Sequence, residues 1–412
     1  MRKPHRSFLP ALLASLFAAT AAPAQGLTPA EVSALGTKYI DPSPATGSSA
    51  AVVVGDTPLA HTAQFLPLNR DRTLHGLRDA EAQARKVLEH LAAALKPAET
   101  GLPQIAKLNV CLAADEHKAA VQRVVSETFD GKAKPAITYV VGELAHPNAW
   151  VAMDAVATTS TPGSRKALHF VNDRLYGGPY ATHASILPNG SRVYISGQAV
   201  RAGNLADSTR KTMEQLAATL RHLDLDWENV VQIKSFLQPM NETAKAREEI
   251  TRFFNGRPAP PMVFVEWTSQ TPIEIELIVA GGVPDDRAEA VEYITPPGMK
   301  ASPVFCRVVR INFGKNAYIS GLQGSGTTQP EAQVRSIFSD LEYLVRKTGS
   351  DMRNLVKATY YVTDAETSAQ LNQLRPEFYD PARPPAASKA MVRSLGSPGG
   401  SIVVDVIAAT KR

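Results

Sequence analysis

Three segments of the chain share one pattern of apolar and polar positions. Each is a run rich in apolar and β-branched residues that predicts a buried strand, and the runs end at Leu112, Leu237 and Val362. In each case an amphipathic helix precedes the strand and a second helix follows it. The equal spacing of the three ends indicates a repeated unit rather than three unrelated segments.

The middle copy shows the pattern most clearly. A short apolar strand at 192–197 is followed by a helix in which Met213, Leu216 and Leu220 share one face, with Asp207 as its predicted N-cap. The other predicted elements are a helix at 241–254 and strands at 181–187, 230–237, 261–267 and 273–279. The unit therefore has the order β-β-α-β-α-β-β.

The other two copies repeat this order, the third more clearly than the first. In the third copy the pattern predicts helices at 329–346 and 369–379 and a final strand at 401–407. In the first copy it predicts helices at 81–95 and 118–129 and a final strand at 150–156.

Each copy is large enough to bury a hydrophobic core of its own, so the repeat is a domain triplication and not a solenoid. Two helices can cover only one face of a sheet of five or six strands, and the other face must be buried elsewhere. Three such faces turned inward around a common axis would bury one another. We therefore predict an α+β fold of three tandem domains, at 51–160, 165–283 and 296–412.

The start of the chain is typical of a Sec-type signal peptide. Basic residues precede an apolar run at 8–22, and Ala22-Pro23-Ala24 fits the small-x-small cleavage rule. We predict a signal peptide at 1–24, a flexible lead-in at 25–50, and an exported protein that is periplasmic or secreted. The alternative is an uncleaved membrane anchor, although the run is short for a span of about 20 residues.

Composition disfavours several functions. The formal net charge is +5, and basic and acidic residues are mixed without a basic stripe, which argues against nucleic-acid binding. No metal-ligand spacing or cofactor fingerprint occurs, so we expect no metal and no cofactor. No later apolar stretch is long enough to span a membrane, so no membrane contact is expected after cleavage. Cys111 and Cys306 could pair in an oxidising compartment, but two buried thiols are the simpler interpretation.

Several motifs of the second copy occur together in one known family. They are Gly178-Pro-Tyr180, Tyr194-Ile-Ser-Gly-Gln198, Phe253-Phe254, Pro258-Ala259 and Ile273-Glu-Ile-Glu276. In this combination the chain resembles the RidA/YjgF family of reactive-intermediate deaminases, and the third copy is similar. The resemblance implies a chorismate-mutase-like fold and a trimer with ligand clefts between subunits. A triplicated chain would then be an intramolecular pseudo-trimer and a monomer.

The resemblance also implies a chemistry, from which this chain departs at one position. The family hydrolyses enamines and imines derived from amino acids, and the Arg of a Pro-Ala-Arg-Ser loop binds the substrate carboxylate through two hydrogen bonds. At that position the three copies have Ile137, Pro260 and Ala387. The family's water-placing Glu is kept as Glu274, and its helix Asn is kept as Asn372. The counterparts of these two residues are Ala152, Val403, Gln122 and Arg247.

The candidate site residues follow from this resemblance. Glu274 is the catalytic candidate, and the substrate-binding candidates are Tyr180, Ser196, Gly197, Gln198, Ser320, Gly321, Asn372, Ser388 and Lys389. Lys389 lies two residues past the lost Arg, on the same strand face, and could supply the missing cation. The alternative is that these residues only stabilise the fold and that Lys389 is exposed to solvent.

Three functions remain open at this point. The first is an exported RidA-like protein that binds a small organic molecule in inter-domain clefts without the family's Arg. The second is an imine or enamine hydrolase that uses Glu274 with a substitute cation, Lys389 or Arg383. The third is a protein-interaction scaffold whose clefts are vestigial.

Overall fold

A computed structural model describes Met1 and residues 36–410, except 131–133, 163, 178–180, 285–286 and 325–326. The signal peptide predicted at 1–24 lies, apart from Met1, outside the described residues and stays a prediction. Among the described helices none is long and apolar enough to cross a membrane.

Each unit folds as a sheet with two helices. The sheet has four strands in the first two units, and in the third the strand that corresponds to β9 is divided into two short strands, β15 and β16, that both pair with β19. The first unit contains β3 (Leu59–Thr62), α2 (Ala80–Leu95), β4 (Ile105–Leu112), α3 (Lys118–Thr128), β5 (Ala136–Val141) and β6 (Val151–Thr158). The second contains β9 (Ser191–Gln198), α4 (Leu205–His222), β10 (Val230–Leu237), α5 (Thr243–Arg252), β11 (Met262–Glu266) and β12 (Ile273–Gly282). The third contains β15 (Asn316–Ile319), β16 (Leu322–Gln323), α6 (Pro330–Lys347), β17 (Leu355–Val362), α7 (Ala365–Phe378), β18 (Ala386–Met391) and β19 (Ile402–Ala409).

The strand order is the same in all three units: β5-β4-β6-β3, β11-β10-β12-β9 and β18-β17-β19-β15. The outer pair at one edge is parallel and the other pairs are antiparallel. At the starts of α2, α4 and α7 a capping side chain accepts from one of the first free N–H groups of the helix. The predicted cap at Asp207 was wrong, because Asn204 caps α4 and accepts a hydrogen bond from the Asp207 backbone N–H.

A β-ribbon at the start of each unit pairs with the sheet of a neighbouring unit. The ribbons are β1 (Lys38–Ser43) with β2 (Ser48–Val54), β7 (Leu168–Phe170) with β8 (Ala184–Leu187), and β13 (Val291–Ile294) with β14 (Val308–Ile311). The first adds to β15 of the third unit, the second to β3 of the first unit, and the third to β9 of the second unit. The exchange is therefore cyclic and links all three units.

This exchange corrects the predicted flexible lead-in at 25–50, because its described part includes a paired strand at 38–43 and the start of another at 48.

Two tight turns show how the chain passes from one sheet to the next. Gly190 and Gly314 have φ of +119° and +108°, and an added Cβ would lie 2.5 Å and 2.4 Å from a carbonyl oxygen of the neighbouring strand end. Glycine is therefore required at both turns.

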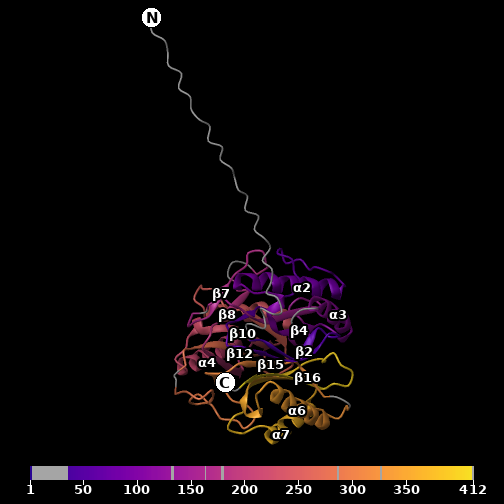
Figure 1. Cartoon of the computed structure of the whole chain (residues 1–412), viewed down its shortest axis with the longest axis vertical. Helices are drawn as coiled ribbons and strands as arrows, with labels where there is room; N and C mark the ends of the chain where they lie inside the picture. The colour runs from indigo at the N-terminus through magenta and orange to yellow at the C-terminus, as the bar shows by residue number, and fades with distance from the viewer. Residues whose placement is uncertain are drawn as a thin grey trace.

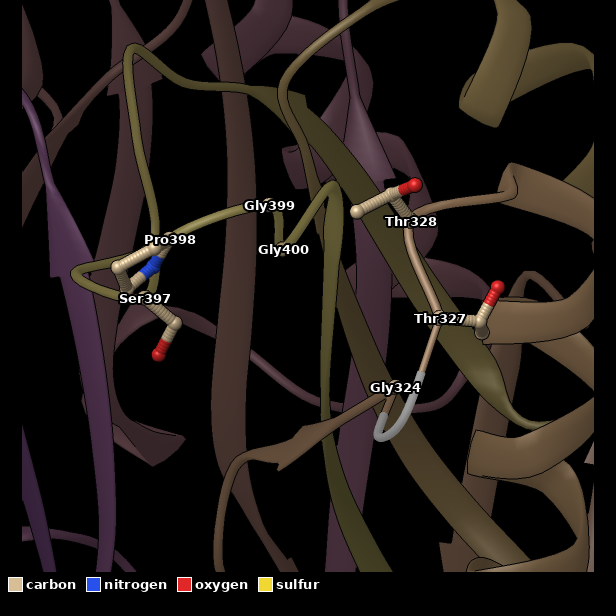
Figure 2. A pocket seen from close by; sticks show the side chains of 7 residues that line it. All are labelled: Gly324, Thr327, Thr328, Ser397, Pro398, Gly399 and Gly400. Atoms are coloured by element: carbon tan, nitrogen blue, oxygen red, sulfur yellow. The ribbon is translucent and has the colours of Figure 1, made fainter.

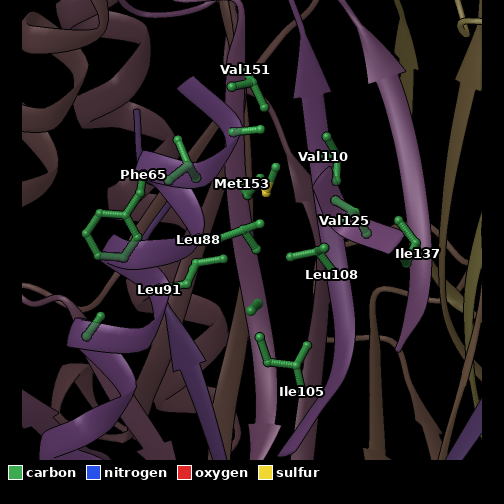
Figure 3. Packing of buried hydrophobic residues seen from close by; sticks show 14 of the residues in the cluster. Phe65, Leu88, Leu91, Ile105, Leu108, Val110, Val125, Ile137, Val151 and Met153 are labelled. Carbon is green, nitrogen blue, oxygen red and sulfur yellow. The ribbon is translucent and has the colours of Figure 1, made fainter. Parts of the chain in front are cut away.

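Each unit buries a core between its helices and its sheet. Figure 3 shows this core in the first unit, where Leu88 and Leu91 of α2 face Ile105, Leu108 and the neighbouring strands. The exchanged ribbons contribute to the cores of the units that receive them, because Ala51 and Val53 of β2 pack in the core of the third unit. The helices lie at the periphery and the strands in the middle of the molecule (Figure 1).

The inward sheet faces meet in a central core that draws on all three units. Val156, Ile278 and Ile407, which occupy equivalent positions on β6, β12 and β19, pack there together. The predicted arrangement of three sheets around a shared centre is confirmed.

Lysine–carboxylate pairs also link the units inside this core. Lys107 Nζ lies 2.9 Å from Asp405 Oδ1, and Lys357 Nζ lies 2.8 Å from Glu276 Oε1.

Cys111 and Cys306 are free thiols, and both are buried. Cys111 packs among residues of all three units, whereas Cys306 donates to the carbonyls of Ile294 and Val308. Of the two interpretations open from the sequence, the structure has the buried thiols. Burial raises the pKa of Cys111 to about 12, so this thiol is protonated at neutral pH.

Candidate functional site

The candidate residues divide between two junctions of the molecule. Gly197 and Glu274 of the second unit lie with Asn372, Ser388 and Lys389 at the junction of the second and third units, which we call the 2–3 junction. Gly197 leaves room for the carboxyl group, since a Cβ there would lie 2.0 Å from Glu274 Oε1. Glycine at 197 and glutamate at 274 therefore depend on each other.

Glu274 is partly buried on β12, and its Oε1 is shielded from solvent and has no hydrogen-bond partner in the described part of the chain. Burial raises the pKa of Glu274 to about 7, and the nearby charge of Glu276 adds to this effect. Ser388 and the charges of Lys357 and Lys389 lower the pKa but do not cancel the rise. Near neutral pH this carboxyl can therefore both release and accept a proton.

Lys389 is half-buried and faces α7. Its ammonium donates to Ser368 Oγ at 2.7 Å and to Asn372 Oδ1 at 3.2 Å. Burial lowers the pKa of Lys389, the charge of Arg375 lowers it further, and Glu274 acts in the opposite direction. Lys389 is thus half-buried rather than fully exposed to solvent, and the charge of Glu274 acts on it across the junction.

Ser388 lies on the opposite face of β18 from Lys389. Its hydroxyl donates to Glu276 Oε2 at 2.8 Å inside the central core. Glu276 in turn pairs with Lys357, which the sequence did not single out. Ser388 therefore connects the junction to the buried ion pair.

Gln198 has a structural contact on β9, whereas Ser196 on the same strand has none through its hydroxyl in the described part of the chain. Gln198 Nε2 donates to Thr219 Oγ1 of α4 at 2.9 Å, so this amide points into the second unit. Ser196 is buried, and its Oγ has no partner in the described part of the chain. Tyr180 lies outside the described residues, and its role stays a prediction.

Ser320 and Gly321 lie at a different junction, between the third and first units. Ser320 Oγ donates to the Ser49 carbonyl and accepts from the Ile137 N–H. A Cβ at Gly321 would contact Thr138 at 3.0 Å, so protein atoms fill this space. These two residues therefore do not join Asn372, Ser388 and Lys389, contrary to their grouping as one set.

Arg383 also lies apart from Glu274. Its Nε donates to the Arg353 carbonyl at 3.1 Å, and its guanidinium stacks on the Tyr293 ring. These contacts leave Lys389 as the substitute cation of the pair proposed from the sequence.

Strand register corrects one of the three positions that were predicted to correspond to the family's carboxylate-binding Arg. Leu108 pairs with Ile137 and Ala358 pairs with Ala387, and the equivalent pair in the second unit joins Ile233 to Met262. The position therefore holds Met262 and not Pro260. None of these three side chains is a cation, so the correction leaves the departure from the family pattern unchanged.

The three junctions differ in polarity. At the 2–3 junction the equivalent positions hold Glu274 and Lys389, which are both ionisable. At the other two, the positions of Glu274 hold Ala152 and Val403 and the positions of Lys389 hold Phe264 and Tyr139. Of these three pairs, only the one at the 2–3 junction joins a carboxyl to a cation.

One residue near this junction was missed from the sequence. Arg375 of α7 is buried, and its Nη2 donates to Asn372 Oδ1 at 2.5 Å. Alignment of the three helices would have found it, because the equivalent positions, four residues before Phe129 and Phe254, hold Val125 and Ile250. A basic residue in an apolar helix position is the detectable signal.

A separate hollow of about 520 Å³ lies in the third unit (Figure 2). It is lined by Gly324, Thr327, Thr328, Ser397, Pro398, Gly399 and Gly400. None of these side chains ionises near neutral pH, so the hollow offers no acid, base or cation. The ionisable groups of the 2–3 junction are the better candidate site.

Comparison with known proteins now identifies the fold family. The family model described as Endoribonuclease L-PSP matches three times, at residues 41–159, 177–281 and 299–410. The chain belongs to the RidA/YjgF family. A solved YjgF-family protein from Neisseria meningitidis is 19% identical and covers 30% of this chain and 96% of its own, with a TM-score of 0.23. A Rid-family protein of unknown function from Yersinia pestis is 23% identical and covers 29% of this chain and 99% of its own, with a TM-score of 0.28. Among curated proteins none matches.

Proposed function

We propose that this RidA/YjgF-family protein binds a small organic molecule at the 2–3 junction. The observation that carries the proposal is that a partly buried carboxyl, Glu274, lies near a half-buried ammonium, Lys389, from another unit. A buried carboxyl that lacks a hydrogen-bond partner at one oxygen is costly for the fold alone. A ligand that hydrogen-bonds to Glu274 would remove this cost.

The asymmetry of the three junctions supports the same proposal. A homotrimer would carry three identical sites, whereas a fused chain can keep one site and close the others. Here Thr138 fills the space at Gly321, and Gln64 N–H donates to the Met262 carbonyl at the junction of the first and second units. These contacts favour packing at two junctions and recognition at the third.

A second candidate function, hydrolysis of an imine or enamine, is favoured by the near-neutral pKa of Glu274. In such a reaction the Glu274 carboxylate would take a proton from water as the water oxygen bonds to the C=N carbon. The nitrogen would be protonated and leave as ammonia or an amine, which gives a carbonyl product. Lys389 would orient an acidic substrate group, although a point charge fixes orientation less well than a guanidinium.

Binding and hydrolysis can be separated by experiment. We expect ligand-observed NMR with a library of small neutral and charged organic fragments to identify binders that Glu274→Gln weakens about tenfold. The control Glu331→Gln removes an exposed carboxylate on α6 and should change nothing. If no fragment binding depends on Glu274, the proposed site is wrong.

The hydrolase candidate has its own assay. With 2-aminoacrylate generated in place, we expect pyruvate release at the uncatalysed rate. An accelerated release that Glu274→Ala abolishes would instead establish hydrolysis as the function.

A further inference from the structure

The buried guanidinium of Arg375 has no carboxylate partner in the described part of the chain. The side chain is on α7 and only 5% of the residue's surface is exposed. The Cζ atom of its guanidinium lies 4.9 Å from the centroid of the Tyr360 ring. Its Nε makes no hydrogen bond among the described residues. Buried arginines are normally matched by an acid, so this cation lacks the counter-charge that burial requires.

The third unit differs from the other two at two positions, one on the edge strand and one on the second helix. On the edge strand, Ile137 and Met262 are large and apolar, whereas the equivalent Ala387 is small. On the helix opposite, Val125 and Ile250 are fully buried in apolar cores, whereas the third unit has Arg375. A cation thus replaces an apolar helix residue where the strand residue is reduced to a methyl group.

Arg375 is connected to Lys389 through one shared acceptor. Asn372 Oδ1 accepts from Arg375 Nη2 at 2.5 Å and from Lys389 Nζ at 3.2 Å. A single neutral amide oxygen therefore serves two cations. Across the junction the nearest acid acting on Lys389 is Glu274. Neither cation has a carboxylate within ion-pair distance in the described part of the chain, and Glu274 acts on Lys389 only through its charge.

We propose that Arg375 and Lys389 form an anion subsite for a small oxyanion such as a carboxylate, held from the helix side of the third unit. This inference rests on the proposed function, because it names the charged group of the molecule bound at the 2–3 junction. The Tyr360 ring holds the guanidinium plane, which can then form two parallel hydrogen bonds to an oxyanion. Ala387 leaves the strand side free of a competing large side chain.

The test compares benzoate with benzamide, which share a shape and differ in charge. Calorimetric titration of the full chain without its signal segment should show that Arg375→Met weakens benzoate binding at least tenfold and leaves benzamide binding unchanged. Lys389→Met should have the same selective effect. Arg346→Met removes an exposed arginine of α6 and should leave both affinities unaltered.

A second measurement keeps the test decisive if Arg375→Met folds poorly. In wild-type protein labelled with ¹⁵N-arginine, one buried Nε–H resonance should shift with benzoate and not with benzamide, and Arg375→Lys should remove it. Equal benzoate affinity in wild type and Arg375→Met, or no shift of this resonance, would overturn the anion subsite. Fragments whose binding needs Glu274 and not Arg375 would support ligand binding at the 2–3 junction and would overturn the anion subsite. Benzoate binding that needs Arg375 and not Glu274 would establish the anion subsite and overturn the role proposed for the Glu274 carboxyl.

Discussion

At the scale of single residues, Glu274 gives the molecule a measurable response to pH. Its pKa is about 7 in the folded protein, against 4.5 for an ordinary glutamate. Because the folded state disfavours ionisation of this carboxyl, the contribution of Glu274 to the free energy of unfolding is greatest below about pH 4.5 and falls as pH rises toward 7. The shift corresponds to roughly 3 kcal/mol. We expect Glu274→Gln to remove this part of the decline, measured by urea unfolding between pH 4.5 and 8.

The control for this prediction is Glu331→Gln, whose carboxylate is exposed and pairs with Arg335. That variant should show the pH dependence of the wild type. Asp154, with a pKa raised to about 6 by burial, contributes in both proteins and cancels in the comparison. Parallel profiles for wild type and Glu274→Gln would mean that the carboxyl is not buried as described.

At the scale of elements, the exchanged ribbons couple the stability of one unit to a ribbon from a different unit. Val53 of β2 pairs with Ala317 of β15 and packs in the core of the third unit. We expect Val53→Ala to cost about 1–2 kcal/mol through lost apolar burial. Hydrogen exchange should show faster amides in β15 and α6, because the third unit loses the contact.

The distribution of exchange rates decides between two topologies. If the ribbon stayed with its own unit, the faster amides would instead lie in β4 and β6. The substitution Thr46→Ala, in the exposed turn of the same ribbon, should leave both regions unchanged.

The helices and strands are the part of this structure that the sequence predicts best. Apolar periodicity identified the helices and central strands, because burial against a sheet leaves a direct trace in the pattern. The ribbon exchange left no such trace, since a strand buries the same residues whether its sheet belongs to its own unit or to a neighbour. The position of the family's Arg in the second unit was placed at Pro260 instead of Met262, because motif spacing does not fix strand register. Arg375 was missed although an alignment of the three helices carries its signal. The pairing of Glu274 with Lys389 depends on contacts between units, which spacing along the chain does not contain.

At the scale of the whole molecule, closure of the three units predicts a single-chain particle. The sheet faces bury one another in the central core, and the cyclic exchange pairs a ribbon with each sheet. No unit therefore needs a second copy of the chain to cover its sheet. We expect analytical ultracentrifugation of the chain without residues 1–24 to give the mass of one chain. Small-angle scattering should give a radius of gyration of about 21 Å, the value for one compact body of this length. A markedly larger radius would indicate units strung along the chain, and a threefold mass would indicate that the units complete one another between chains.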